Sequence, residues 1–415
     1  MSKRKQRKEE QEKVNKISDV KMAYIMYGKK VFVIPIVIAI ILGAVIWGIV
    51  YNTRKNNAPQ ESADNQKEQI NYIWGEIKPG KKNTNNYTMV TSSDGIQVPV
   101  PTGYTASSAS DENSVNGGFV IYEGTEAVTD SNKWEAQCNR NQYVWIPIAD
   151  VSNMYWRDQT TGKKYGTTYT FSSSSYSKSS SNKYEPQTTR YDIQSTYLTQ
   201  YLNGMSREDF LMEMEIDFDK MLNSVATYGG YYIGRYQAGD LAQATPVVKR
   251  INTDIGDQTW YTMWKKARKL TGTSAGVQMI WGIQWDETLK WLIDTGEKTY
   301  AEIGSDSTSW GNYYNSSFTY YTNTSKSTAT KSANSYTRIP SGAYEGANAN
   351  NVFDLAGNVY DWTLESNSSG TGTYRYGRGG GYGSYGYYSP AAYRDNDFPY
   401  DSYDYVGLRC ALYVK

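Results

Sequence analysis

The amino-acid sequence predicts an α+β fold for most of the chain, preceded by a single N-terminal transmembrane helix. From about residue 71 onward, short runs rich in β-branched and aromatic residues alternate with turn signals. Two apolar patterns with helical spacing lie among these runs, and one long uncharged apolar run lies near the N-terminus. This mixture indicates a folded head in which helices pack on an antiparallel sheet.

The N-terminal region predicts a membrane anchor. The uncharged run Val31–Tyr51 is long enough to span a bilayer at roughly 1.5 Å of rise per residue. Basic residues crowd positions 1–30, whereas few follow the run. The positive-inside rule therefore predicts a cytoplasmic tail over 1–30, a transmembrane helix over 31–51 and an extracellular head. The polar segment 52–70 between them predicts a flexible stalk.

Composition excludes several classes of chemistry. The chain contains no histidine, which excludes histidine general bases and histidine metal ligands. Its two cysteines, Cys138 and Cys410, are too few for a four-cysteine zinc site, although they could pair with each other outside the cell. A formal net charge of +1 predicts no nucleic-acid partner. Tyrosine is the outlier, with 40 residues against 8 phenylalanines, which favours contact surfaces as well as cores.

Strand patterns recur in the head. The runs Gly117–Gly124, Gln142–Ile148 and Gly229–Gly239 are rich in β-branched and aromatic residues and are bounded by glycine or polar clusters, so each predicts a strand. The stretch 158–196 is rich in Ser, Thr and Tyr and lacks a hydrophobic period. It therefore predicts a surface loop or insertion.

Helix patterns are also present. Apolar residues recur three or four apart over Arg207–Tyr228, with Ser206 placed as an N-cap and Gly229 as a stop. A second helix is predicted over Gln284–Asp294 and a third over about Trp260–Leu270.

Five short motifs occur in order in the last part of the chain: QWDETLKWL (Gln284–Leu292), SWGNY (Ser309–Tyr313), NNVFDLAGNVYDWTLE (Asn350–Glu365), GRGGGY (Gly377–Tyr382) and VGLRCALY (Val406–Tyr413). Together they resemble the sulfatase-modifying-factor, or formylglycine-generating-enzyme, family. The resemblance implies a C-type-lectin-like core over 228–415, with 71–227 forming an N-terminal part of the head.

The resemblance does not bring the family's enzyme chemistry with it. Oxidase members use two cysteines, five apart, just after a GGSY-like turn. Placing that turn on Gly379–Tyr382 puts the cysteine positions on Ser384 and Ser389, which carry no thiol for copper binding or redox chemistry. We therefore expect a non-catalytic member. The alternative is an extracytoplasmic formylglycine-generating-type oxidase that acts on protein cysteine.

The resemblance leaves one cofactor open. Some family members bind structural calcium near the turn that Asn358 and Asp361 match, so structural calcium is the one cofactor to consider. The simpler interpretation of the two residues is a turn asparagine and a surface carboxylate. Arg378, Arg409 and Trp362 are expected to belong to the scaffold.

Residues 381–405, called the variable segment below, resemble the variable part of family members diversified by retroelements. In those proteins adenines are randomised, mostly in AAC codons, which gives Tyr, Asp, Ser, Gly, Ala and Asn but never Lys, Glu, Gln, Met or Trp. None of these five residue types occurs between Gly381 and Val406. A composition of Tyr, Ser, Gly and Asn is also typical of antibody paratopes.

The predicted function is a membrane-anchored, receptor- or adhesin-like binder that holds an unknown protein or glycan at the cell surface. A disordered low-complexity tail and a structural envelope or spore-surface protein are the alternatives. The predicted contact residues are the variable-looking positions of the variable segment: Gly381, Gly383, Ser384, Tyr385, Tyr387, Tyr388, Tyr393, Asp395, Asn396, Asp397, Tyr400, Asp401, Tyr403, Asp404 and Tyr405.

Overall fold

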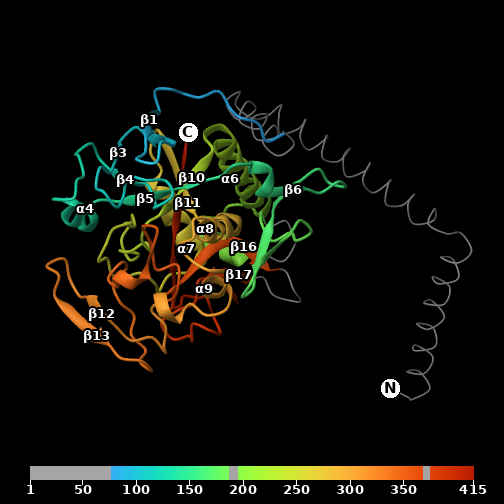
Figure 1. Cartoon of the computed structure of the whole chain (residues 1–415). Coiled ribbons are helices and arrows are strands. Elements are labelled where there is room, and N and C mark those ends of the chain that lie inside the picture. The colour runs from blue at the N-terminus through green and yellow to red at the C-terminus, as the bar shows by residue number, and fades with distance from the viewer. Residues whose placement is uncertain (1–75, 187–194, 368–373) are drawn as a thin grey trace, which may run out of the picture. The chain divides into compact units, whose positions relative to one another are not determined.

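A computed structural model gives the fold and describes residues 76–186, 195–367 and 374–415 (Figure 1). The tail, transmembrane helix and stalk that the sequence predicts for 1–30, 31–51 and 52–70 lie outside these residues. Among the helices of the described part, none is long and apolar enough to cross a membrane.

The centre of the head is a six-stranded antiparallel sheet in the order β11-β20-β10-β5-β4-β3. Its strands are β3 (Tyr104–Ala106), β4 (Val120–Glu123), β5 (Gln142–Pro147), β10 (Gly230–Gly234), β11 (Ala275–Met279) and β20 (Cys410–Val414). The three strands that the sequence predicts are confirmed as β4, β5 and β10. Strand β20 lies between β10 and β11, so the end of the chain is a central element of the sheet.

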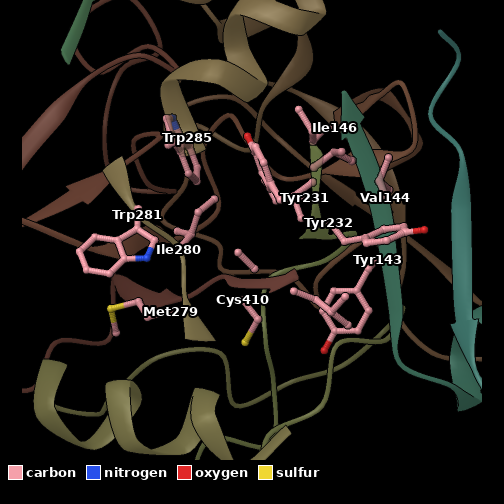
Figure 2. Close-up of a cluster of buried hydrophobic side chains, with 14 of the residues drawn as sticks. Tyr143, Val144, Ile146, Tyr231, Tyr232, Met279, Ile280, Trp281, Trp285 and Cys410 are labelled. Carbon is pink, nitrogen blue, oxygen red and sulfur yellow. The ribbon is translucent and has the colours of Figure 1, made fainter. Parts of the chain in front are cut away.

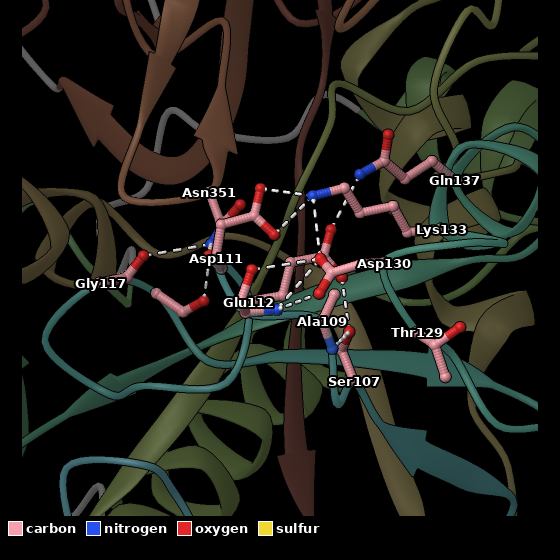
Figure 3. Close-up of polar contacts among 12 residues, drawn as sticks. Ser107, Ala109, Asp111, Glu112, Gly117, Thr129, Asp130, Lys133, Gln137 and Asn351 are labelled. Carbon is pink, nitrogen blue, oxygen red and sulfur yellow. Dashed lines mark hydrogen bonds and ion pairs between the residues drawn. The ribbon is translucent and has the colours of Figure 1, made fainter.

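The sheet unites the two parts that the sequence separates at residue 228. Strands β3 to β5 come from the first part and β10, β11 and β20 from the second, and the described residues between 76 and 415 belong to one compact unit. Polar contacts cross the same boundary, since the Asn351 amide donates to the carbonyl of Asp111 at 2.6 Å and to that of Gly117 at 3.1 Å (Figure 3). Nearby, Glu112 accepts a hydrogen bond from Arg235 at 2.6 Å. Burial raises the pKa of Glu112, but the Arg235 guanidinium, together with hydrogen bonds from Ser107 and Gln137, lowers it to about 2.

The long helix α6 (Arg207–Tyr228) follows the sequence prediction at both ends. The Ser206 hydroxyl accepts a hydrogen bond from the Asp209 backbone N–H at 3.0 Å, and Gly229 ends the helix in the left-handed region at φ 82°. The apolar face of α6 is buried against the central sheet. The other two predicted helices are confirmed as α7 (Trp260–Ala267), extended by a 3-10 turn over Arg268–Leu270, and α8 (Gly282–Asp294).

Tyrosines and tryptophans fill much of the core beside the central sheet (Figure 2). Tyr231 is fully buried, and its hydroxyl donates to the Gln284 carbonyl at 2.5 Å. Tyr232 is also fully buried, with its hydroxyl bound to a backbone carbonyl at 3.1 Å. Both cysteines, Cys138 and Cys410, are buried free thiols and do not pair with each other.

The stretch 158–196 is not a surface loop throughout, so that expectation is wrong for its first half. It contains β7 (Lys164–Gly166), β8 (Thr168–Phe171) and β9 (Tyr176–Ser179). The Tyr169 backbone N–H donates to Asp286 at 2.8 Å and its hydroxyl donates to Glu287 at 3.0 Å. Polar partners on α8 let this segment be buried without an apolar pattern.

A second, four-stranded sheet carries the variable segment, in the order β18-β17-β16-β19. Its strands are β16 (Tyr360–Asn367), β17 (Tyr374–Arg378), β18 (Arg394–Asp397) and β19 (Val406–Leu408). The variable segment leaves the end of β17, passes through β18 and returns to β19. It is part of the folded head, so the interpretation as a disordered tail is wrong.

Smaller elements cover the rest of the described chain. The strands are β1 (Tyr87–Thr91), β2 (Gln97–Pro101), β6 (Tyr155–Arg157), β12 (Phe318–Tyr321), β13 (Thr328–Lys331), β14 (Asn348–Ala349) and β15 (Val352–Phe353). The α-helices are α4 (Lys133–Asn139), α5 (Ser195–Tyr201) and α9 (Tyr300–Gly304), and the 3-10 turns are Val151–Asn153, Thr308–Trp310 and Glu345–Ala347.

Candidate ligand-binding surface

Four ion pairs between two arginines and two buried carboxylates fix the strands that carry the variable segment. Arg378 ends β17 and binds Asp286 at 2.7 Å and Glu365 at 3.3 Å. Arg394 begins β18 and binds the same two carboxylates, at 2.5 Å and 2.9 Å. Asp286 lies on α8 and Glu365 on β16, so two arginines and two carboxylates hold four elements together: β16, β17, β18 and α8. Charge-assisted hydrogen bonds of this kind are among the stronger polar interactions in proteins. We call these four residues the ion-pair frame.

The ion-pair frame also holds the backbone of the variable segment. Arg378 donates to the carbonyls of Ala392 and Tyr393, at 3.3 Å and 3.2 Å. The Trp285 indole N–H donates to the Ala391 carbonyl at 3.1 Å. At the start of the segment, Gly380 has φ 79°, and a Cβ atom there would lie 2.3 Å from a backbone oxygen. These contacts make the middle of the segment a fixed platform for its side chains.

Asn358 and Asp361 do not fit a calcium site. Asp361 is fully buried, and its carboxylate accepts a hydrogen bond from Arg409 at 2.8 Å, so the expectation of a surface carboxylate is wrong. The Asn358 side-chain oxygen already accepts N–H groups from Asn312 at 3.0 Å and Ile339 at 3.1 Å. The guanidinium repels a cation from Asp361, and the Asn358 oxygen is used by the turn. Both residues act as scaffold.

The predicted contact residues lie at the surface, with the exception of buried Gly381. Tyr388 is 70% exposed, Tyr387 is 46% exposed and Tyr393 is 38% exposed. The other exposed members are Gly383, Asp401 and Asp404, and the half-buried ones are Ser384, Tyr385, Asp395, Asn396, Asp397, Tyr400, Tyr403 and Tyr405. The rings of Tyr387, Tyr388 and Tyr393 are therefore not packed into the core, whereas Tyr400, Tyr403 and Tyr405 are partly buried against it.

One group of these tyrosines continues beyond the variable segment. Tyr385 lies 5.3 Å from Tyr387 and 5.9 Å from Tyr388 between ring centroids, and 5.3 Å from Tyr314. Tyr314 in turn lies 4.7 Å from Tyr336, which is 73% exposed. We call these five residues the tyrosine cluster. Tyr314 and Tyr336 could not be recognised as surface residues of this cluster from the sequence, because they stand in polar loops with no local pattern. The abundance of tyrosine in the chain was the one signal that pointed to such a surface.

A second group combines phenols with carboxylates. Tyr403 and Tyr405 lie 5.1 Å apart between ring centroids. Their hydroxyls reach Asp401 at 3.3 Å and Asp397 at 3.4 Å, respectively. Burial, with added repulsion from Asp397 and Asp401, raises the pKa of Tyr403 to about 12. This part of the surface carries a negative potential.

Tyr400 differs from the other predicted contact residues because its ring is used for packing. It stacks on Tyr197 of α5, with ring centroids 4.4 Å apart and an interplanar angle of 13°. Phe398 stacks on Tyr400 from within the same segment, at 5.1 Å. We therefore assign Tyr400 to the support of the surface more than to ligand contact.

A hollow lies beside the most exposed phenols. Its volume is about 570 Å³, and Tyr387, Tyr388 and Tyr393 lie on its wall together with Phe171 of β8 and Arg394. A ligand that covers the exposed rings therefore has a concave place for one protruding group.

The two serines at the enzyme's cysteine positions are close together. The Tyr360 hydroxyl lies 3.0 Å from the Ser384 hydroxyl and 3.1 Å from the Ser389 hydroxyl. Both groups are hydroxyls, so neither supplies a thiol. Burial raises the pKa of Cys410 to about 12, and burial also raises the pKa of Cys138. Neither thiol is suited to act as a thiolate.

The chain belongs to the family of sulfatase-modifying factor enzyme 1-like domains, whose match covers residues 99–414. The match begins well before residue 228, so most of the N-terminal part of the head belongs to the family domain. Family membership does not by itself decide whether the chain is an enzyme.

Among solved structures, Treponema denticola variable protein 1 is similar to this chain. It is 14% identical, the match covers 44% of this chain and 84% of that chain, and the TM-score is 0.28. At this level of superposition the similarity carries no argument about function. No curated protein matches the chain.

Proposed function

We propose that this protein is a membrane-anchored, surface-displayed binding protein whose variable segment holds a protein or glycan ligand without catalysing a reaction. One observation carries the proposal. The phenols of Tyr387, Tyr388 and Tyr393 are exposed, while the backbone beside them is fixed: Arg378 binds the carbonyl of Tyr393, and the N–H of Gly386 donates to the side chain of Asn315. Exposed aromatic rings on a rigid support are what a binding surface requires.

The magnitudes fit a protein-sized contact. A tyrosine buries ~150–250 Å² when it is fully covered, so four or five engaged rings account for most of the ~800 Å² per partner of a standard interface. A pinned backbone keeps the entropy lost on binding low, because little remains to be ordered. Tyrosine also has few rotatable bonds for its contact area.

The variability of the surface is tested by comparing the gene among sibling strains. We expect substitutions to concentrate at the predicted contact residues between Gly381 and Tyr405, and the frame residues Arg378 and Arg394 to stay constant. A near-copy of the 3′ end of the gene, with adenines at the varying positions, is expected beside a reverse-transcriptase gene. Uniform drift along the chain would instead favour a structural envelope protein.

Anchoring is tested on intact cells. The proposal places residues 1–30 inside, the anchor at 31–51, and the head beyond a stalk at 52–70. It is supported by the apolar run and the charge asymmetry around it. Added protease is expected to release the head while a tag at the N-terminus stays protected. A head that survives on intact cells and is cut only after lysis would refute the surface display.

Family membership favours one second candidate, the extracytoplasmic oxidase that acts on protein cysteine. Ser384 and Ser389 supply no thiol, so we expect no aldehyde when the full chain is incubated with a cysteine-containing peptide and copper. Aldehyde formed in proportion to the protein would establish the enzyme and refute the non-catalytic proposal.

A further inference from the structure

The variable segment carries an unbalanced negative charge. It contains Asp395, Asp397, Asp401 and Asp404 and a single basic residue, Arg394. The Arg394 guanidinium belongs to the ion-pair frame and is bound there by two carboxylates. The four aspartates of the segment therefore have no basic partner within it.

Asp404 differs from the other three aspartates because an arginine, Arg338, contacts it. It accepts a hydrogen bond from the Tyr382 hydroxyl at 2.8 Å, and Arg338 donates to its backbone carbonyl at 2.7 Å. Arg338 is itself paired with Asp257 at 3.4 Å. The remaining three, Asp395, Asp397 and Asp401, are called the acidic trio below.

The acidic trio makes no ion pair with any residue that the structure describes. Burial raises the pKa of Asp395 and of Asp397, and repulsion from Asp395 adds to the shift at Asp397. Half-buried carboxylates without cations destabilise each other, and a cation brought to them removes this cost.

The geometry of β18 favours an extended partner. Arg394 points into the ion-pair frame, so the alternation of a strand places Asp395 and Asp397 together on the opposite face. Their side chains repeat at roughly 7 Å, which is also the repeat of alternate residues in an extended peptide. Strand β18 is the outermost strand of its sheet, and no described strand pairs with its outer edge.

Phenols complete the cation-binding character of the surface. The hydroxyls of Tyr403 and Tyr405 lie against Asp401 and Asp397, so rings and carboxylates alternate over this patch. Ring faces attract ammonium and guanidinium groups, and carboxylates bind the same groups by charge-assisted hydrogen bonds. Anionic glycans, nucleic acids and anionic lipid surfaces are repelled by the same charges.

We infer that the ligand of this surface is an extended, lysine- or arginine-rich segment of another protein, bound between the acidic trio and the neighbouring tyrosines. The inference rests on the proposed function and specifies its ligand. The exposed rings would supply most of the affinity, and the acidic trio would select for a positively charged ligand.

The test is a selection of random peptides displayed on phage against the full chain held in lipid nanodiscs. Peptides that depend on Tyr387, Tyr388 and Tyr393 are expected to be enriched in Lys and Arg over the starting library. Replacing the acidic trio by asparagine should weaken the affinity for a selected peptide by about tenfold or more at low salt. The salt dependence of its binding should fall at the same time.

A matched control removes three exposed carboxylates elsewhere, by Glu126→Gln, Glu135→Gln and Glu208→Gln. The control variant should bind a selected peptide like the unaltered protein. Tyrosine-dependent peptides that are neutral or acidic, or that ignore the loss of the acidic trio, would overturn the inference and leave the proposed function standing. Tyrosine-dependent binding to a glycan array in place of any peptide would do the same. Tyrosine-dependent binding to neither the peptides nor the glycan array would overturn both.

Discussion

The tyrosines of the central sheet and those of the variable segment have opposite environments in one chain. Tyr143, Tyr231 and Tyr232 are fully buried between strands and helices, whereas Tyr387 and Tyr388 are 46% and 70% exposed. Burial raises the pKa of Tyr231 and Tyr232 far above the usual value near 10. The two groups share a side chain and differ only in the backbone that carries it.

This difference teaches how one residue type can serve both stability and binding. In the sheet, the consecutive residues Tyr231 and Tyr232 point to opposite faces, and both rings are buried because other elements cover each face. In the variable segment, glycines and serines interrupt the pattern and the rings remain at the surface. A segment whose side chains contribute little to folding can change its sequence, provided that the frame beneath it does not change.

The largest expected effect breaks the buried side of the comparison. Tyr231→Ala should lower the free energy of unfolding by about 3–5 kcal/mol, because it leaves a large cavity and removes the hydrogen bonds of the hydroxyl to Gln284 and Thr288. Tyr231→Phe keeps the ring and should cost only about 1 kcal/mol. Denaturant unfolding measures both variants. If Tyr231→Ala lowers the free energy of unfolding no more than a typical surface substitution does, the core tolerates this cavity.

The next effect concerns the frame beneath the exposed rings. Arg394→Lys keeps the charge but cannot bind Asp286 and Glu365 through one planar group. We expect a loss of about 1.5–3 kcal/mol in the free energy of unfolding, the range of hydrogen bonds to charged groups. Faster amide hydrogen exchange should appear in β18 before it appears in the central sheet. Equal changes in both places would mean that the frame is not a separate support.

Carboxylates, like tyrosines, occupy buried as well as exposed positions in this chain, and Glu185 is a buried example. The buried carboxylate of Glu185 lies beside the N-terminus of α8. There it accepts hydrogen bonds from the backbone N–H groups of Gly282 at 2.7 Å and Ile283 at 2.6 Å. Burial, with added repulsion from Glu365, raises its pKa from 4.5 to about 8. The folded state therefore holds this proton more tightly than the unfolded state does. Glu185 should lower the stability of the protein as the pH rises between these two values.

Glu185→Gln tests this sign. The variant carries no titrating group at this position, so the free energy of unfolding should fall less steeply over the same pH range. The difference in slope cannot exceed about 1.4 kcal/mol per pH unit, the limit for one proton. Denaturant melts at several pH values measure it. Identical slopes for the two proteins would mean that Glu185 is ionised in the folded state.

The sequence predicted local features of this fold better than distant ones. Helix α6 was predicted to its ends, because its cap, its apolar spacing and its terminal glycine are all local signals. The variable segment was found from composition, which is also local. The ion-pair frame needs Arg394 and Asp286, which are 108 positions apart, so no local pattern could reveal it. The strands within 158–196 were missed for the same reason, since the burial of β7 and β8 depends on distant partners, Asp219 on α6 for Lys164 and Asp286 on α8 for Tyr169.

The smallest expected effect on stability lies on the exposed side of the comparison. Replacing Tyr387, Tyr388 and Tyr393 by alanine should change the free energy of unfolding by less than about 0.5 kcal/mol each, because exposed sites contribute little to folding. The same variants should lose binding to any peptide selected by the unaltered protein, since they remove most of the exposed ring area. Tyr336→Ala, outside the variable segment, should weaken binding less and leave stability unchanged. Unfolding of the triple variant would show that these rings are part of the core after all, and the distinction between the two groups of tyrosines would fail.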